Sequence, residues 1–296
     1  MNDRIEWIDA AKGIAILMVM SLHLMQYLPR PDWLFRMFFL GAMGVQLFFI
    51  LSAYCLCMTW KPERFDGWYW WKKYKRLAPW YFLGIVLYAA YWAFISKENG
   101  IGYYTVKNVL LNVFFLNGFV EEAQNKIVPG GWSISCIALF VFVFPFFAFM
   151  KRGLKVTVLS ALSIIFSGIM AYGYLRLGWD RCFTYYHPCC QFGVFAFGVF
   201  FWEFRCELKQ FISSKSGGNV VSVIGTATFL LCVAAFFFDR DMALIYRQYL
   251  MSVSFACGLL LLQDMDKAMP RWLGWLGRHS YELFILHFII IWIPLR

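Results

Sequence analysis

Three ionisable side chains, Asp9, Lys12 and His23, interrupt an apolar segment, Glu6–Leu28, that is long enough to span a bilayer. Charged or titratable groups inside a membrane span cost free energy, which makes each of them a candidate for function. In a helix, the eleven residues from Lys12 to His23 make about three turns, so both side chains share one face, about 16 Å apart. Asp9 lies one turn before Lys12 and can pair with it. The spacing predicts a helix face that carries a proton acceptor, the imidazole of His23, and a cation, Lys12.

Each of these residues also has a plainer interpretation. Lys12 could extend its amine to the membrane interface. Asp9 could be an ordinary acid near a helix start, and His23 could be a histidine with partners inside a helix bundle. The shared face and the later segments favour the functional interpretation.

The composition predicts an all-α, polytopic helical membrane protein. Hydrophobic residues make up 61% of the 296 residues and the mean hydropathy is +0.61, values that exclude a soluble globular domain. We expect a single transmembrane domain over residues 1–296, with about nine transmembrane helices in one bundle. The first segment is too long for a cleavable signal peptide and lacks a small-residue cleavage site, so we expect it to stay as a span.

The net charge of +10 indicates contact with membrane lipids rather than with nucleic acid. In a membrane protein, Lys and Arg mark cytoplasmic loops and attract anionic lipid head groups, and they would also attract a soluble anionic cofactor. The nine cysteines are scattered, mostly in apolar segments, and lack the spacing of a zinc site. We therefore expect neither a metal site nor a disulfide framework.

The nine expected spans are separated by polar or basic loops. They cover approximately residues 6–28, 34–60, 79–96, 130–150, a stretch that ends near 177, 189–204, 219–238, 242–263 and 281–296. The segment Val106–Val120 is short and contains three asparagines, so we expect an interfacial or re-entrant helix there. Most of the 27 Lys and Arg residues then fall on one side, which predicts a cytoplasmic N-terminus and an extracytoplasmic C-terminus.

A basic cluster precedes the third span. Lys72, Lys73, Lys75 and Arg76 directly follow the aromatic run Trp68–Trp71. One interpretation is an anchor on anionic lipid at the membrane interface. The other is a clamp for the phosphates of an anionic cofactor, because Lys and Arg supply charge-assisted hydrogen-bond donors.

The second span carries small and polar residues. Gly41 and Gly44 lie about one turn apart, and we expect them to allow close helix packing. Gln46 and Ser52 are polar groups that need partners inside the bundle, which makes both of them candidates for a substrate site.

Five motifs follow one another over almost the whole chain. They are Asp9 with Lys12-Gly13 and His23; GVQLFFILSAY at 44–54; Lys73 with Arg76-Leu77 and Pro79; WSIS at 132–135; and LGRHSYELFILH at 276–287. Each motif is weak alone, but in this order they resemble those of the membrane acyltransferase family three. Members of this family are integral membrane O-acyltransferases of bacterial surface polysaccharides.

The resemblance implies an enzyme of the bacterial inner membrane that moves an acyl group, often acetyl, to a hydroxyl of a sugar or surface-polysaccharide precursor. The donor would be acetyl-CoA or another acyl-CoA, used as a substrate, and no cofactor would be bound permanently. His23 would act as the catalytic base or as a transient acyl carrier, and Asp9 would orient Lys12. The remaining candidates are Lys12, Lys72, Lys73 and Arg76 for the donor, and Gln46, Ser52, Trp132, Ser133, Ser135 and His287 for the substrate site.

The chain departs from the family pattern at several positions. Lys12 and Lys73 replace arginines, which keeps the charge but loses the bidentate fork. Gln46 replaces an aspartate and Ala53 a glycine. Ile137 stands where a glutamate usually follows the WSIS motif, so a mechanism that needs that carboxylate is put in doubt.

Other interpretations stay open at the level of function and of single residues. The chain could be a transporter or flippase for an acyl or glycan intermediate, with the buried ionisable groups lining a path. It could also be a non-catalytic membrane scaffold or sensor, which the Ile137 departure makes more credible. For Ser133 and Ser135, hydrogen bonding between helices is the favoured role, and His287 would act behind the groups that touch substrate.

Overall fold

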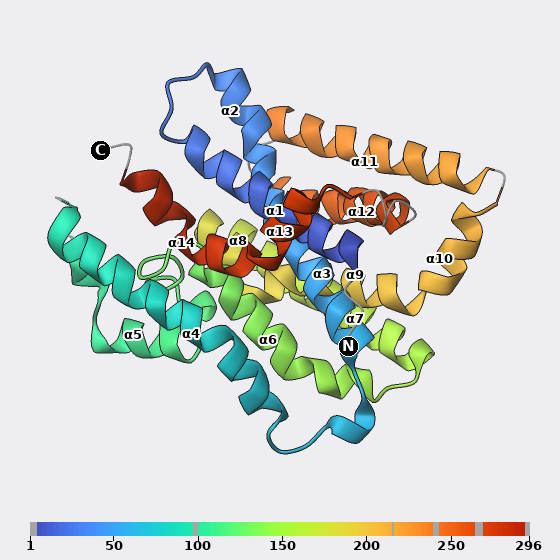
Figure 1. Ribbon diagram of the computed structural model, residues 1–296, viewed down its shortest axis with the longest axis horizontal. Coiled ribbons are helices and arrows are strands. Elements are labelled where there is room, and N and C mark those ends of the chain that lie inside the picture. Colours follow the sequence, from blue (N-terminus) through green and yellow to red (C-terminus); the bar gives the residue numbers. More distant parts are fainter. Residues whose placement is uncertain (1–4, 97–99, 215, 239–242, 264–268, 294–296) are drawn as a thin grey trace. The chain divides into compact units, whose positions relative to one another are not determined.

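The computed structural model describes residues 5–96, 100–214, 216–238, 243–263 and 269–293, and this part of the chain is helical without strands (Figure 1). The all-α expectation is therefore confirmed. The α-helices are α1 Glu6–Met25, α2 Asp32–Phe39, α3 Gly44–Thr59, α4 Tyr69–Ala90, α5 Val106–Val113, α6 Gly131–Ala148, α7 Arg152–Arg176, α8 Arg181–Tyr186, α9 Pro188–Glu203, α10 Arg205–Ile212, α11 Gly217–Phe238, α12 Ala243–Gln263, α13 Arg271–Arg278 and α14 Ser280–Trp292.

Six described helical stretches are long and apolar enough to cross a membrane, so the chain is a multi-pass membrane protein, but the expected count of nine is not confirmed. The expected spans at α9 and α14 have 16 and 13 residues, fewer than the roughly 20 that a bilayer needs. The six stretches are Glu6–Met25, Asp32–Thr59, Tyr69–Ile95, Gly131–Ala148, Arg152–Arg176 and Gly217–Ala235.

The chain divides into two compact units, and the single domain expected from the sequence stays a prediction. Unit 1 comprises Met1–Cys55 and Val194–Ser280, and unit 2 comprises Leu56–Gly193 and Tyr281–Arg296. Each unit joins segments that are far apart in the sequence.

In unit 1, helix α1 lies against α13 and against the short 3-10 helix Leu40–Met43 (Figure 1). Small residues make these approaches possible. A Cβ atom at Gly277 would meet the carbonyl oxygen of Asp9, and one at Gly41 or Gly44 would meet a carbonyl oxygen of α1. The close packing predicted for Gly41 and Gly44 is therefore confirmed.

In unit 2, helix α4 is tied to α14 by tyrosine hydroxyls. Tyr88 donates to the carbonyl oxygen of Ile285 at 2.9 Å, and Tyr281 donates to that of Leu77 at 2.7 Å. The closeness of Gly84 to the Ile285 side chain allows this approach. These bonds give buried hydroxyls the partners that an apolar surrounding requires.

The segment Val106–Val120 forms only the eight-residue helix α5, followed by a turn and a 3-10 helix at Asn117–Phe119. Phe115, with a φ of 57°, reverses the chain after α5. Within the segment, Asn112 accepts from the Tyr81 hydroxyl at 2.7 Å and donates to the carbonyl oxygen of Asn108 at 2.8 Å. This short, hydrogen-bonded segment agrees with the expectation that it does not cross the membrane as one helix.

Candidate functional site

Helix α1 carries the first group of candidates in unit 1. Lys12 Nζ lies 4.0 Å from Asp9 Oδ1, so the predicted pairing one helical turn apart is confirmed. Because α1 runs without a break from Glu6 to Met25, Lys12 and His23 lie on one helix about three turns apart. Both side chains are half-buried, and neither is sealed inside the unit.

His23 has a defined ring orientation near the end of α1. Its Nδ1 lies 2.9 Å from Oε1 of Gln26, one turn further along the helix. An amide oxygen can only accept, so Nδ1 carries the proton in this arrangement and the lone pair is on Nε2. Nε2 is therefore the nitrogen that would take a proton from an acceptor hydroxyl.

The two polar candidates of α3 have different surroundings. Gln46 is fully buried, whereas Ser52 is half-buried. A buried amide has to be held by hydrogen bonds, which fits a positioning role better than a contact with a large substrate.

The basic cluster of unit 2 splits into three environments. Lys72 is exposed and pairs with Asp66 at 2.7 Å, and this bond lowers the pKa of the Asp66 carboxyl. Arg76 is exposed on α4. Lys73 is half-buried, with Nζ 5.4 Å from the centre of the Tyr69 ring. Of these three residues, Lys73 lines the two cavities described next, and Lys72 and Arg76 line neither of them.

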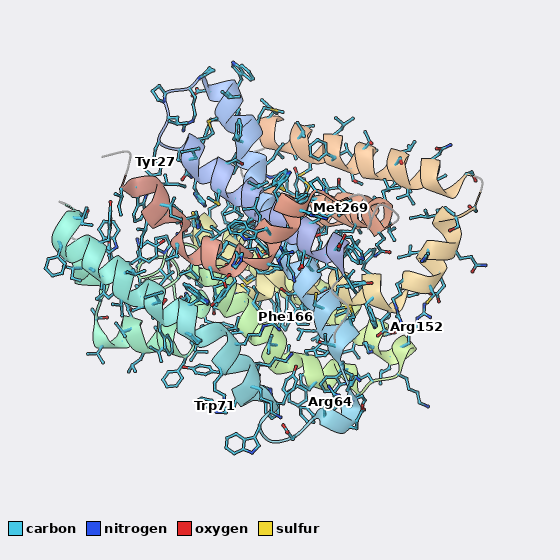
Figure 2. The ribbon with its side chains drawn as sticks, in the orientation of Figure 1. Tyr27, Arg64, Trp71, Arg152, Phe166 and Met269 are labelled. Carbon is cyan, nitrogen blue, oxygen red and sulfur yellow. The ribbon has the colours of Figure 1, made fainter. Side chains whose placement is uncertain are left out.

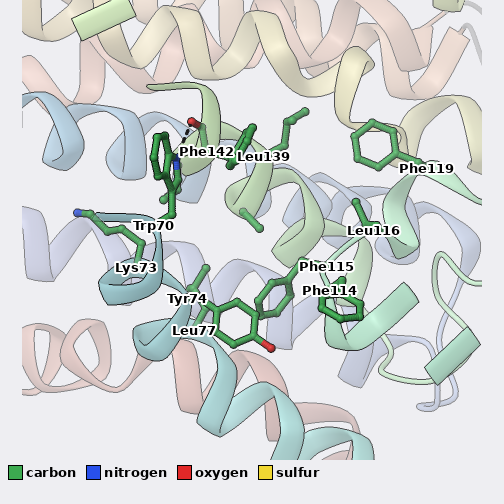
Figure 3. Close-up of a pocket in the computed structure, with 12 residues that line it drawn as sticks. Trp70, Lys73, Tyr74, Leu77, Phe114, Phe115, Leu116, Phe119, Leu139 and Phe142 are labelled. Atoms are coloured by element: carbon green, nitrogen blue, oxygen red, sulfur yellow. Dashed lines mark hydrogen bonds between the residues drawn. The ribbon is translucent and has the colours of Figure 1, made fainter. Parts of the chain in front are cut away.

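Lys73 borders a cavity of about 520 Å³, which we call the apolar cavity (Figure 3). Figure 3 shows Trp70 and Lys73 on one side of it and Phe119 on the opposite side. The indole N–H of Trp70 donates to the carbonyl oxygen of Phe142 at 3.1 Å, so this polar group is hydrogen-bonded to another residue of the lining. The lining is Trp70, Lys73, Tyr74, Leu77, Phe114, Phe115, Leu116, Phe119, Ala138, Leu139, Val141 and Phe142.

A second cavity, of about 150 Å³, shares Lys73 and lies at the loop that leads into α4. Figure 2 labels Arg64, a residue of this loop. We call it the basic cavity, because Lys61, Arg64 and Lys73 line it and no carboxylate does. Its other lining residues are Leu56, Thr59, Trp60, Phe65 and Tyr69.

The WSIS motif in unit 2 is held by structural contacts. Ser135 donates to the carbonyl oxygen of Phe115 at 2.6 Å and accepts from the amide of Gly118 at 3.1 Å. Ser133 donates to the carbonyl oxygen of Gly130 at 2.8 Å. Trp132 stacks on a tyrosine ring at 4.7 Å, that of Tyr186. Ser135 thus links α6 to the segment after α5, as expected for a bond between elements, whereas Ser133 bonds within the first turn of its own helix.

His287 is fully buried in α14. Its Nδ1 lies 2.6 Å from the carbonyl oxygen of Phe284, which requires the proton on Nδ1. Its ring packs 4.3 Å from that of Phe288. This burial fits a group that acts behind the residues that touch substrate.

Residues 5–293 match the family model described as an acyltransferase domain, acyltransferase family 3. The chain belongs to this family. No curated protein and no solved structure matches it. Together with its apolar helices, the family makes this chain a membrane acyltransferase.

The candidate residues of this membrane acyltransferase fall into both units, and their catalytic and binding roles stay predictions. Unit 1 holds Asp9, Lys12, His23, Gln46 and Ser52, and unit 2 holds Lys72, Lys73, Arg76, Trp132, Ser133, Ser135 and His287. Within unit 1, α1 brings Asp9 and Lys12 together. Within unit 2, Lys72 and Lys73 are neighbours on α4, but they have different surroundings.

Sequence reasoning missed four lining residues of the basic cavity: Trp60, Lys61, Arg64 and Tyr69. A signal existed, because Lys61 and Arg64 follow the second apolar stretch directly and a run of aromatics comes next. Trp60, Lys61 and Arg64 are nine or more residues from Lys73 in the sequence, which hid the cavity. A turn at Pro62–Arg64 brings these residues back to α4.

Proposed function

We propose that this membrane acyltransferase moves an acyl group, most simply acetyl, from a CoA-type donor to a hydroxyl of a sugar or surface-polysaccharide precursor. The observation that supports it best is the arrangement of α1, where the Asp9–Lys12 ion pair and the His23 imidazole lie on one continuous helix. Acyl transfer to an alcohol needs a base for the hydroxyl proton and a held donor. Helix α1 offers a residue for each task.

In the proposed reaction, His23 Nε2 takes the proton as the acceptor oxygen attacks the thioester carbonyl carbon. The carbon–sulfur bond then breaks, the acyl group stays on the acceptor oxygen as an ester, and the proton on His23 passes to the leaving thiolate. The Nδ1 contact with Gln26 supports this role, because it leaves the lone pair on Nε2. Asp9 would orient Lys12 rather than take part in the proton transfer.

The donor's phosphates would be attracted by the cations near the start of α1 and α4. Lys12 on α1 and the cluster of Lys72, Lys73 and Arg76 on α4 are the proposed contacts, because ammonium and guanidinium groups bind phosphate by charge-assisted hydrogen bonds. The exposure of Arg76 and Lys72 favours them for a soluble donor. Lys73, which is half-buried, also lines two cavities.

We place the enzyme in a bacterial inner membrane with a cytoplasmic N-terminus and an extracytoplasmic C-terminus. The distribution of Lys and Arg over the loops supports this orientation. A cytoplasmic start of α1 would put Lys12 on the side where acyl-CoA is available.

The proposal is tested by mass spectrometry of surface glycans from cells with the intact protein, without it, and with the His23→Ala variant. We expect an acyl ester only in cells with the intact protein. The matched control is His279→Ala, which removes an exposed histidine at the end of α13 and should leave the ester in place. A glycan whose esters persist but whose amount changes would instead support a transporter.

A further inference from the structure

The basic cavity of unit 2 has the features of an oxyanion site. Three cations, Lys61, Arg64 and Lys73, line it, and the two nearest acidic residues in the loop, Glu63 and Asp66, do not. Asp66 is also occupied, since it pairs with Lys72. The cavity therefore concentrates positive charge, which favours an anionic occupant.

Two buried donors at this cavity have no hydrogen-bond partner in the part of the chain that the structure describes. They are the indole N–H of Trp60 and the hydroxyl of Tyr69. Tyr69 is only 8% exposed, and the Trp60 ring is enclosed by Phe65, Phe144 and other aromatic rings. A buried donor without a partner costs free energy, so a ligand that supplies an acceptor there is stabilised. Phosphate carries several acceptor oxygens, which is the chemistry that these two donors lack.

The adjoining apolar cavity has a mainly apolar lining, and the polar groups of Trp70 and Tyr74 in it are hydrogen-bonded to carbonyl oxygens. Its volume of about 520 Å³ is within the usual range for ligand sites, about 300–1,000 Å³. Phe114, Leu116 and Phe142 of its lining remain substantially exposed, so apolar surface is available to an occupant. An aliphatic chain is the chemistry that this wall would bind.

Lys73 links the two cavities, because it is the one residue that lines both. Its aliphatic stem can border the apolar cavity while its amine reaches the basic one. The occupant should therefore carry a phosphate within a few bonds of an aliphatic chain. A phospholipid has this arrangement, whereas an acyl-CoA has a long pantetheine arm between its phosphates and its acyl group.

We propose that unit 2 binds an anionic phospholipid, with the phosphate in the basic cavity and one acyl chain in the apolar cavity. Lys61, Arg64 and Lys73 bind the phosphate, with Trp60 and Tyr69 as neutral donors. No residue of this site belongs to α1, so the site stands whether or not His23 is the base. The exposed cation Arg76 lines neither cavity and remains available to a soluble donor.

The test is native mass spectrometry of the purified full chain in detergent, titrated with phosphatidylglycerol and, in parallel, with phosphatidylcholine. We expect one phosphatidylglycerol to bind more tightly than phosphatidylcholine. The variants Arg64→Gln and Lys73→Gln should each weaken this binding about tenfold, which is the loss expected for a charged hydrogen bond. Lys75→Gln is the matched control, because Lys75 is exposed two residues from Lys73, contacts Trp71 and lines neither cavity.

If Lys73→Gln and Lys75→Gln weaken phosphatidylglycerol binding equally, the proposal is overturned. That result would show that any cation on this surface attracts the lipid. Ala138→Phe, which fills the apolar cavity, should also weaken phosphatidylglycerol binding. If Ala138→Phe has no effect while inorganic phosphate or CoA displaces the lipid, the basic cavity is a site for soluble anions and the proposal fails.

A second measurement uses only the wild-type chain and so does not depend on whether a variant folds. Phosphatidylglycerol with a photoreactive diazirine in its acyl chain is irradiated with the protein, and the cross-linked peptides are sequenced. We expect cross-links within 114–119 and 138–142, the two segments that line the apolar cavity opposite α4. Cross-links spread evenly over lipid-facing helices would contradict the proposal.

Discussion

At the scale of single residues, the chemistry proposed for α1 depends on the positive charge of Lys12 and on the lone pair of His23 Nε2. Lys12 keeps its ammonium within 4.0 Å of Asp9, and His23 keeps a proton on Nδ1 toward Gln26. A lysine in place of the family's arginine provides a point charge instead of a planar fork. Lys12 should therefore contribute to donor affinity mainly through its charge.

We expect Lys12→Gln to weaken binding of acetyl-CoA about tenfold, because a charged hydrogen bond to phosphate contributes about 1.5–3 kcal/mol. Lys12→Arg should restore it to within about twofold. The measurement is equilibrium binding of radiolabelled acetyl-CoA to the protein in nanodiscs. Lys107→Gln, which removes the charge of an exposed lysine on α5, is the control. Unchanged binding in Lys12→Gln would exclude Lys12 as a donor contact.

His187 gives a residue-level prediction about pH. Burial lowers its pKa to about 4, and its Nδ1 accepts from the amide of Cys189 at the start of α9. Protonation would remove this acceptor and place a positive charge at a helix N-terminus, where cations are unfavourable. The unfolded state binds the proton more tightly between about pH 6.5 and 4, so stability is full above that window and is lost as pH falls through it.

The expected loss is about 1–3 kcal/mol after allowance for partial exposure, measured as a fall in the thermal midpoint between pH 7 and pH 4.5. His187→Asn keeps a hydrogen-bond acceptor but does not titrate, so it should flatten this pH dependence. His279→Asn, at an exposed position, should not. The same slope in both variants would show that other groups cause the pH dependence.

At the scale of elements, the position of the candidate residues on α1 depends on the packing of α1 against α13. Gly277 lies so close to the Asp9 carbonyl that a methyl group cannot enter without backbone movement. Asp9 also pairs with Lys12. A backbone shift at Asp9 caused by a larger residue at position 277 would therefore also move the ion pair.

Gly277→Ala should lower the free energy of unfolding by about 1–3 kcal/mol, because an added methyl group in tight packing forces the two helices apart. Gly274→Ala is a matched control on the same helix, where a Cβ meets only the end of the flexible Arg278 side chain. It should be neutral or stabilise by up to about 1 kcal/mol, since alanine is the better helix former. Chemical unfolding of both variants in detergent measures the difference; equal stability would contradict the packing argument.

The sequence predicts best those features that depend on the spacing of residues close together in the chain. The helical period places Asp9 and Lys12 one turn apart, and small residues at 41 and 44 indicate close packing without knowledge of the partner helix. The three asparagines in the short apolar stretch Val106–Val120 likewise indicate that this segment does not cross the membrane as one helix, and α5 has only eight residues. The basic cavity could not be found this way, because it depends on a loop that brings Trp60 and Arg64 back beside Lys73.

At the scale of the whole molecule, the number of crossings decides on which side each loop lies. Nine spans put the C-terminus opposite the N-terminus, whereas the six helices that satisfy length and hydropathy would put both on the same side. The two topologies diverge at α9, whose 16 residues are about 24 Å long, against a hydrocarbon core of about 30 Å. Arg205 and Lys209 follow α9 directly and favour a cytoplasmic end for it.

Two native cysteines distinguish these topologies. Cys182, before α9, should be extracytoplasmic in both, whereas Cys206, after α9, is cytoplasmic only if α9 crosses. Both side chains are exposed. We expect a membrane-impermeant maleimide to label Cys182 in intact spheroplasts and Cys206 only after permeabilisation. Partial desolvation, with the nearby Asp180 carboxylate, raises the pKa of the Cys182 thiol and slows its reaction. Each cysteine is therefore compared with itself before and after permeabilisation. Labelling of Cys206 in intact spheroplasts would show that α9 does not cross, and would place the basic segment that follows it on the extracytoplasmic side.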